Sequence, residues 1–337
     1  MKKRYGRWYK TIDFEKIQCE LCPRLCVLKE GARGYCGVRS MQQGKIVSDA
    51  WARIVALNID PIEKKPLYHY YPGQDILSLG TLGCNLRCQF CQNWSISCAK
   101  YDDSTTKEYS PEEIVDIAKT KCKMIAYTYN EPIVWGEYAV ECAKLARKLG
   151  IKNIMVSAGF VCSEPRNEIF SHMDAANIDL KGFSEDFYKD FTGAQLGPVL
   201  ETIEYLAQLK DFWLEITTLL IPGLNDSPEM LRQEFEWIAK HAGCHTPLHL
   251  SAFFPQHKML DRDPTTLQSL QSAQKLALDI GLNYVYLGNV MHAAHTYCPQ
   301  CENTLIERWR YDTIITGLNG ANCKKCGRKL EGQFDDF

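Results

Sequence analysis

The sequence predicts an α/β fold with a parallel sheet covered by helices. Short apolar runs alternate with stretches of helical spacing about six times along the 337 residues, which is the pattern of repeated strand–helix units. Polar residues collect where the apolar runs end, as ligands do at the carboxyl ends of barrel strands. No GxGxxG follows the first run, so a barrel or partial barrel is favoured over a doubly wound sheet.

Helix signals separate the expected strands. Ser110 precedes Pro111 and stands three residues before Glu113, the pattern of an N-cap, a first-turn proline and a capping box. Ser227 repeats most of this pattern before the next helix. A further helix follows Pro132 and is expected to stop near Gly150. The expected strands are residues 76–82, 124–130, 153–159, 175–181, 212–221, 247–254 and 283–289.

Composition fits a globular protein without a membrane partner. Apolar residues make up 45% and charged residues 24%, and the net charge of -2 gives no global field toward nucleic acid or lipid. The basic start MKKRYGRWYK lacks the apolar run of a secretory signal, and no uninterrupted apolar stretch of about 18 residues could span a bilayer. We expect a cytoplasmic protein, because CxxC clusters without a leader indicate metal chemistry in a reducing compartment.

Twelve of the sixteen cysteines fall into three groups. The N-terminal group is Cys19, Cys22, Cys26 and Cys36, the central group is Cys84, Cys88 and Cys91 with Cys98 nearby, and the C-terminal group is Cys298, Cys301, Cys323 and Cys326.

The central group directly follows the first expected strand. Three thiolates from one short loop suit three irons of a [4Fe-4S] cubane, because each must reach a different corner, and the fourth iron then has no protein ligand. An open iron can bind a substrate or cofactor and pass it an electron. The alternative is a zinc site with Cys98 as its fourth ligand.

The CxxxCxxC spacing resembles the signature of the radical S-adenosylmethionine (SAM) superfamily. The resemblance implies that the open iron chelates the amino and carboxylate groups of SAM. It also implies that reductive cleavage gives methionine and a 5'-deoxyadenosyl radical, which abstracts hydrogen from a substrate.

Further motifs narrow the resemblance. Together the sequence looks like the activase-like radical enzyme of the AmmeMemoRadiSam set, related to pyruvate formate-lyase activating enzyme. The motifs are CELCPRLC with GYCGVR, DPIEKKPLYHYYPG, GCNLRCQFCQNW, TYNEP, NIDLKG and IPGLND. They cover about residues 17–290 and imply a partial (β/α)6 TIM-like barrel. We therefore expect a Cys-rich extension at 1–75, a radical SAM partial barrel at 76–292 and a zinc-ribbon-like module at 293–337.

The resemblance implies that Asn130 and Glu131 take the place of the superfamily's GGE-type motif, where a carboxylate accepts from the amino group of SAM. TYNEP lacks the glycine pair, so either side chain could make that contact. Ser157, Asp179 and Lys181 match strand-end positions that hold the methionine and ribose moieties. An internal ion pair is the alternative for Asp179 and Lys181, because both point to one side of a strand.

The resemblance places His257 near the ribose and Gly288 and Asn289 at the border of the adenine. The alternative for His257 is a structural role, since histidines often serve as packed hydrogen-bonding groups. We expect no catalytic side chain beyond the cluster.

The C-terminal group has the form CPQC, 21 intervening residues, then CKKC. This is close to the pattern of a zinc ribbon, in which two CxxC knuckles supply four thiolates to one tetrahedral ion. A rubredoxin-like iron site has the same ligands. In the N-terminal group four thiolates close the site, and either zinc or a second iron–sulfur cluster is compatible with them.

These patterns predict an enzyme that cleaves SAM and abstracts hydrogen, with electrons from a donor such as flavodoxin or ferredoxin. One alternative is an activase that takes hydrogen from a glycine of a partner protein. Another is a non-catalytic zinc-binding or electron-transfer protein. The basic CKKCGRK segment keeps a nucleic-acid substrate open. The motifs do not specify the substrate, since a rim built from loops can change without altering the scaffold.

Overall fold

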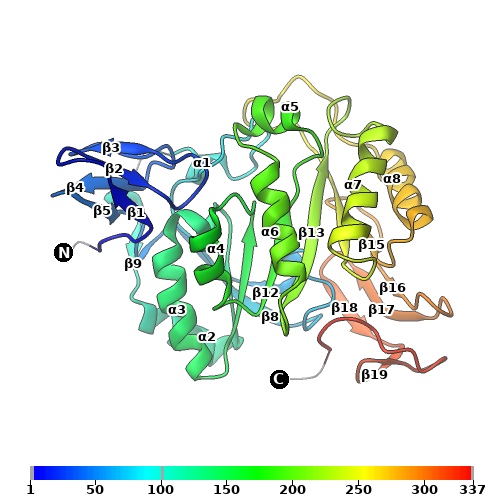
Figure 1. Ribbon diagram of the computed structural model, residues 1–337. Helices are drawn as coiled ribbons and strands as arrows, with labels where there is room; N and C mark the ends of the chain where they lie inside the picture. Colours follow the sequence, from blue (N-terminus) through cyan, green and yellow to red (C-terminus); the bar gives the residue numbers. More distant parts are fainter. Residues whose placement is uncertain (1–3, 100–101, 335–337) are drawn as a thin grey trace.

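The computed structural model describes residues 4–99 and 102–334, and its centre is an eight-stranded sheet (Figure 1). In spatial order the strands are β15 (Val285–Gly288), β14 (Leu248–Ala252), β13 (Trp213–Leu220), β12 (Ala175–Asp179), β11 (Lys152–Ser157), β10 (Met124–Tyr127), β8 (Asp75–Gly80) and β7 (Ala56–Pro61). All pairs are parallel except β7 with β8. The parallel strands follow chain order without the reversal that a doubly wound sheet has. The predicted α/β class and all seven predicted strands are confirmed.

Each of the six connections between parallel strands carries one longer helix. These helices are α2 (Pro111–Lys121), α3 (Gly136–Lys148), α4 (Ser163–Phe170), α6 (Gly197–Ala207), α7 (Pro228–His241) and α8 (Leu267–Ile280). Consecutive helices pack against one another and form one layer over the sheet (Figure 1). Shorter segments are α1 (Trp94–Ser97), α5 (Glu185–Phe187), 3-10 turns at Ile62–Lys64, Asp103–Thr105 and Pro132–Trp135, and a π turn at Tyr188–Thr192.

Helix α2 begins as the sequence predicts. The Ser110 hydroxyl accepts from the Glu113 backbone N–H at 3.2 Å, and the Glu113 carboxylate accepts from the Ser110 N–H at 2.7 Å. This reciprocal pair satisfies two backbone donors that a helix start leaves without partners. Ser227 likewise caps α7 by accepting from Met230 N–H at 3.2 Å. The predicted helix after Pro132 is a 3-10 turn that continues into α3 and ends two residues before Gly150.

The parallel strands of the sheet are largely buried on both faces, which explains why they read as continuous apolar runs. All four residues of β10, Met124–Tyr127, are fully buried. A parallel sheet covered on its faces favours such uninterrupted runs over apolar–polar alternation. Burying one side chain such as Met124 or Ile125 contributes about 1.5–3 kcal/mol to the scaffold that carries the strand ends.

The N-terminal extension is built from short strands that share the core of the sheet. Ile17, Met41 and Ile46 belong to the same buried apolar cluster as Tyr127 of β10. The strands are β1 (Tyr9–Thr11), β2 (Lys16–Cys19) and β3 (Val27–Lys29) in one antiparallel sheet, the β4 (Arg39–Gln42) and β5 (Lys45–Ser48) hairpin, and β6 (Arg53–Ile54) paired with β9 (Lys107–Glu108).

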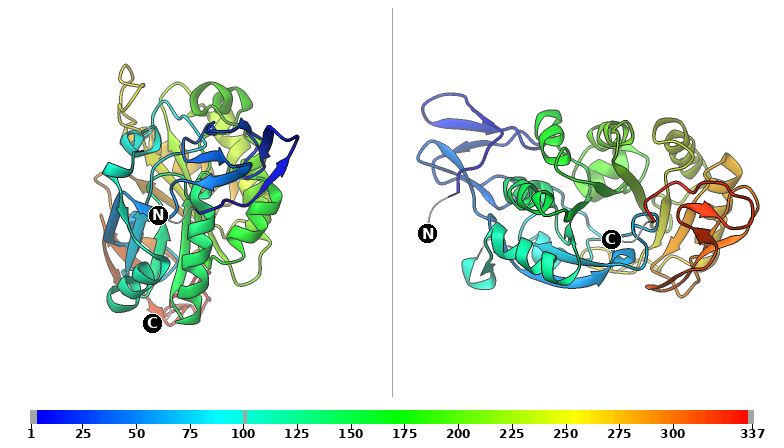
Figure 2. Two further views of the ribbon diagram at one scale, coloured as in Figure 1. Left: turned by 90° about the vertical axis from the view of Figure 1, so that its left-hand side faces the viewer. Right: turned by 90° about the horizontal axis from the view of Figure 1, so that it is seen from below.

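The C-terminal segment lies at the opposite end of the molecule from the N-terminal strands (Figure 2). It has its own apolar cluster, in which Leu305 and Ile306 pack with Tyr68 and Tyr286. Its strands are β16 (Thr296–Tyr297), β17 (Thr304–Trp309) and β18 (Asp312–Ile315) in an antiparallel sheet, and β19 (Leu318–Asn319) paired with β20 (Asn322–Cys323).

A buried polar network at the amino end of the sheet holds the segment that joins these parts. The carboxylate of Glu215, near the start of β13, accepts from the backbone N–H of Tyr68 and of His69 at 2.9 and 2.8 Å. It also accepts from His249 Nε2 at 2.6 Å and from Trp213 Nε1 at 2.9 Å. Burial would raise the pKa of Glu215, but the hydrogen bond and charge of His249 hold it below its ordinary value. One fully buried carboxylate therefore accepts hydrogen bonds from four donors that lie in three separate segments of the chain.

Two further observations concern membrane-spanning helices and disulfide bonds. In the part of the chain that the structure describes, no helix combines the length and apolarity that crossing a membrane requires. All sixteen cysteines lie within the described residues, and all are free thiols.

Candidate functional site

A cavity of about 410 Å3 opens at the carboxyl ends of the parallel strands. It lies where the sequence pattern predicts a site, because the ends of neighbouring parallel strands meet at one edge of the sheet. The structure brings eight of the predicted residues to its lining: Cys84, Cys88, Cys91, Asn130, Glu131, Ser157, Asp179 and Lys181. Three cysteines and the polar ends of β10, β11 and β12 thus face one space.

The cysteine loop leaves the sheet through a tight contact at Gly83. This residue has φ +87°, and a Cβ there would lie 2.5 Å from the Cys36 carbonyl oxygen. Only glycine tolerates both conditions. The Asn130 side chain fixes the same loop, since its amide donates to the Gly83 carbonyl at 2.7 Å and its oxygen accepts from Thr81 N–H at 3.1 Å. Asn130 is therefore committed to positioning the loop.

The central thiols lie in a buried, low-dielectric setting. Burial raises the pKa of Cys88 to about 12 and raises those of Cys84 and Cys91 as well. Thiolate ligands must therefore release protons when the metal binds. Cys98 is exposed and does not line the cavity. The donors that face the cavity fit a cluster with three protein ligands.

Glu131 is a buried carboxylate in the lining of the same cavity as the three cysteines. Its Oε1 accepts from Ser157 Oγ at 2.6 Å and from Ile133 N–H at 3.1 Å, and its Oε2 accepts from Ala158 N–H at 2.9 Å. Burial raises the pKa of Glu131 even though these donors oppose the shift. A carboxylate offers about four acceptor positions, so one remains for a donor in the cavity.

Asp179 and Lys181 form an ion pair on the cavity wall. Lys181 Nζ lies 2.8 Å from Asp179 Oδ2. Burial would lower the pKa of Lys181, but the charge of Asp179 raises it above its ordinary value. The internal ion pair, which was the alternative for these two residues, is therefore present. Both side chains also line the cavity.

The other three predicted residues lie outside the cavity lining. His257, with φ +55°, stacks on Trp94 with ring centroids 5.4 Å apart. Asn289, just after β15, donates from its side chain to the Ala252 carbonyl at 2.8 Å. Gly288 is the last residue of β15. None of the three lines the cavity, but the loop of His257 contacts the cysteine loop, because the Lys258 N–H donates to the Gln89 carbonyl at 2.9 Å.

Asp60, Lys64 and Lys65 also line the cavity and were not among the predicted site residues. Asp60 accepts from Lys64 Nζ at 3.0 Å, from Lys65 Nζ at 2.9 Å and from Tyr129 Oη at 2.7 Å. Burial would raise the pKa of Asp60, but hydrogen bonds from the two lysines and Tyr129 hold it below its ordinary value. The DPIEKK segment is the sequence feature from which these charged residues could have been identified. Two lysines against one carboxylate leave this end of the cavity net positive.

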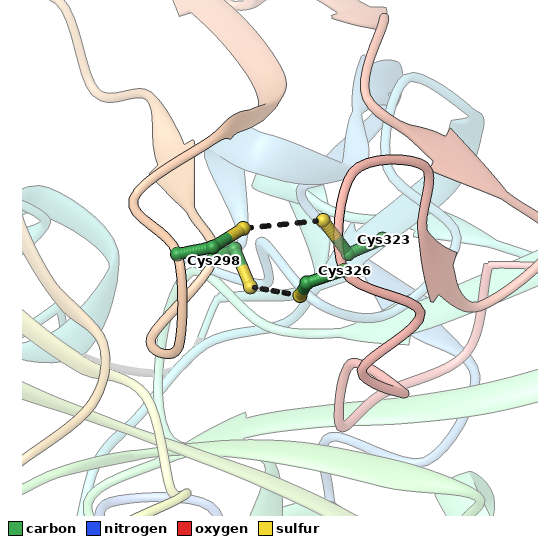
Figure 3. Close-up of side chains that lie close together, drawn as sticks. Cys298, Cys323 and Cys326 are labelled. Atoms are coloured by element: carbon green, nitrogen blue, oxygen red, sulfur yellow. Dashed lines mark hydrogen bonds between the residues drawn. The ribbon is translucent and has the colours of Figure 1, made fainter.

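The C-terminal cysteines gather around one point. Cys298 Sγ lies 3.6 Å from Cys326 Sγ, and Cys301 Sγ lies 3.7 Å from Cys323 Sγ. Figure 3 shows thiols from the two loops pointing toward each other. Four sulfurs about 2.3 Å from a tetrahedral zinc ion would be about 3.8 Å apart. The spacing therefore fits a single tetrahedral ion.

The central and N-terminal groups differ from this arrangement. Within residues 4–99 and 102–334, the C-terminal thiols form the one group of three or more Cys, His, Asp or Glu ligand atoms that all lie within 4.8 Å of one another. The four N-terminal cysteines instead surround a second, narrow void. In neither of these two groups do the sulfur atoms converge on a single ion position.

Comparison with known proteins identifies the domain. Residues 79–235 match the model of the radical SAM superfamily. The chain is 41% identical to "Uncharacterized protein MJ0808" of Methanocaldococcus jannaschii over 333 residues, which is 97% of this chain and 99% of that protein. It is 26% identical to "Putative glycyl-radical enzyme activating enzyme MJ1632" of the same organism over 222 residues, or 64% of this chain and 80% of that protein.

The fold is also found among solved structures. A radical SAM methyltransferase from Sphaerobacter thermophilus matches with a TM-score of 0.51 and 11% identity, covering 85% of this chain and 76% of that one. At this identity the likeness concerns the arrangement of strands and helices alone.

Proposed function

This chain carries a radical SAM domain and belongs to one family with MJ0808, and from that premise we propose that it reductively cleaves SAM at a [4Fe-4S] cluster. The observation that carries the proposal is the cavity in which Cys84, Cys88 and Cys91 face Glu131 and the Asp179–Lys181 pair. Its volume of about 410 Å3 lies within the range of small-molecule sites.

Each charged side chain of the cavity is assigned to the group of SAM that complements its charge. Glu131 keeps an acceptor position for the ammonium group, whereas the Asn130 amide is used by the cysteine loop. Lys181 supplies positive charge for the carboxylate, and Asp179 offers acceptors for ribose hydroxyls. Ser157 holds Glu131 in place by its 2.6 Å hydrogen bond. His257, Gly288 and Asn289 are proposed to border the ribose and adenine at the outer side.

When bound, the cluster would supply an open iron to the methionine end of SAM and one electron to its sulfonium. The chain's own contribution is orientation and exclusion of water. Cys88 and Glu131 are buried, and the apolar side chains of Leu86 and Phe90 line the same space. A reactive radical requires such shielding, because it would otherwise react with solvent or protein groups at random.

A second candidate is activation of a partner protein by hydrogen abstraction from a glycine. The name of MJ1632, a putative glycyl-radical enzyme activating enzyme, favours it. Membership of the AmmeMemoRadiSam set rests on the joint motifs quoted from the sequence. In either role the electron would come from a donor such as flavodoxin or ferredoxin in a reducing cytoplasm. The non-catalytic alternative gives no reason for polar residues from three strand ends to meet beside the cysteines.

We also propose a division into three parts. The extension at 1–75 precedes a partial (β/α)6 barrel at 76–292, supported by six helical connections in chain order. A zinc-ribbon-like module at 293–337 is supported by the 3.6 and 3.7 Å sulfur separations. Zinc there would stabilise a segment whose apolar cluster is small.

The test is anaerobic production of 5'-deoxyadenosine from SAM and a reductant, with Glu131→Gln as the informative variant. We expect the variant to bind SAM about 10- to 100-fold more weakly, since one hydrogen bond to a charged group contributes about 1.5–3 kcal/mol. SAM affinity is measured by equilibrium binding and by the KM for 5'-deoxyadenosine formation.

Glu164→Gln, at an exposed position on α4, is the matched control and should leave SAM affinity unchanged. Iron content should be equal in all three proteins, because Glu131 is not a cluster ligand. An unaltered KM in Glu131→Gln would remove this residue from the SAM site. Absence of 5'-deoxyadenosine from the fully reconstituted wild type would reject the proposed function.

A further inference from the structure

We propose that Cys19, Cys22, Cys26 and Cys36 bind a second [4Fe-4S] cluster rather than a zinc ion. Four thiolates occupy all four irons of such a cluster, so this centre cannot bind SAM. The assignment concerns the metal alone and does not depend on the proposed function.

The first argument is the void that the four cysteines help to line. The cysteines line a void of about 10 Å3 together with Leu21, Arg39 and Val134, among others. This is close to the smallest space that admits one water molecule. Four sulfurs around zinc each lie about 2.3 Å from its centre and leave no room for a water-sized sphere between them. A water-sized void lined by the four cysteines indicates that their thiols are not drawn onto a single zinc position.

The second argument is a comparison inside the same chain. The C-terminal thiols, which have zinc-like separations, lie within 4.8 Å of one another. Among the described residues the N-terminal thiols do not form such a group, and neither do Cys84, Cys88 and Cys91. In a cubane cluster each sulfur ligates a different iron, so the ligands stand farther apart than around one ion. The N-terminal group therefore follows the pattern of the central group.

The third argument is a buried donor beside the void. Arg39 is 1% exposed, and its Nη1 donates to both oxygens of Glu137 at 2.8 and 2.9 Å, while Nη2 donates to the Arg7 carbonyl at 2.7 Å. Its Nε is buried and has no hydrogen-bond partner among the described residues. A buried N–H without an acceptor is costly. The thiolates of a bound metal centre would supply that acceptor. This observation supports a metal at the N-terminal group, and the first two arguments favour a cluster over zinc.

The location of the N-terminal group points to a use for the second cluster. The Cys36 carbonyl packs against Gly83, the residue before Cys84, so the two cysteine loops are in direct contact. A closed cluster holds or passes single electrons. Beside the central loop it would sit on a short path to the cluster proposed there, and this use, unlike the metal assignment, rests on the proposed function.

The test uses the full chain with Cys84, Cys88 and Cys91 all changed to Ala. After anaerobic reconstitution with iron and sulfide, we expect this variant to retain about four iron atoms and four sulfides per chain, the content of one cubane. Mössbauer spectroscopy should show a [4Fe-4S] centre. Adding Cys22→Ser and Cys26→Ser should remove that iron, whereas adding Cys244→Ser, at an exposed scattered cysteine, should not.

Zinc at the N-terminal group with no iron in the triple variant would overturn the assignment. The wild type provides a measurement that does not depend on the variant folding. It should hold about eight iron atoms if both groups bind cubanes, and about four would contradict the proposal. The triple variant cannot cleave SAM in either case, so failure of this assignment is distinguishable from failure of the proposed function.

Discussion

Cys88→Ala is expected to reduce 5'-deoxyadenosine production to the level measured without protein. Cys88 is buried at the cavity and is the middle one of the three cysteines proposed to hold the cluster. Its loss leaves two thiolates, which can hold only two corners of a cubane. Product is measured by chromatography after anaerobic incubation with SAM and a reductant, and iron content is measured on the same sample.

Cys98→Ala is the matched control for this prediction. Cys98 follows α1 in the same loop region, but it is exposed and does not line the cavity. Its loss should leave both product and iron content unchanged. If Cys98→Ala abolished activity while Cys88→Ala retained it, the assignment of ligands in this loop would be wrong.

Glu215→Ala is expected to have the largest effect on stability. The substitution leaves the donors of Tyr68, His69, Trp213 and His249 without their buried acceptor. Removing one partner from a buried charged network costs about 3–5 kcal/mol. The expected result is a lower midpoint of urea denaturation, measured with the metals bound.

Glu307→Ala tests whether any loss of a carboxylate has the same effect. Glu307 lies exposed on β17, and its removal should change stability by less than about 0.5 kcal/mol. Equal midpoints for Glu215→Ala and the wild type would show that the network does not support the fold. Because Glu215 lies at the opposite end of β13 from the cavity, SAM affinity should be little altered in folded protein.

The strand and helix pattern could be predicted because it depends on local chemistry. Continuous apolar runs such as Met124–Tyr127 indicate strands buried on both faces, and Ser110 with Glu113 marks a helix start. Eight site residues could be predicted for a related reason. They lie at the ends of recognisable strands, and parallel pairing in chain order brings those ends together.

Other features depend on contacts that local pattern does not encode. Asp60 and Lys65 reach the cavity because β7 pairs antiparallel with β8 at the sheet edge, and nothing in their own segment specifies that pairing. His257 and Asn289 lie on loops after strands, where the direction of a side chain is set by packing such as the His257 stack on Trp94. The kind of metal that the N-terminal group suits depends on distances between sulfurs, which spacing along the chain does not give.

The central claim is that one iron of the Cys84, Cys88 and Cys91 cluster is open to SAM. Electron–nuclear double resonance of the reduced protein, with SAM carrying a nitrogen-15 label in its amino group, tests this most directly. The account predicts a coupling between the labelled nitrogen and the cluster, together with a change in the cluster's electron paramagnetic resonance spectrum on addition of SAM. A spectrum that SAM leaves unchanged, with no coupling to the label, would contradict it.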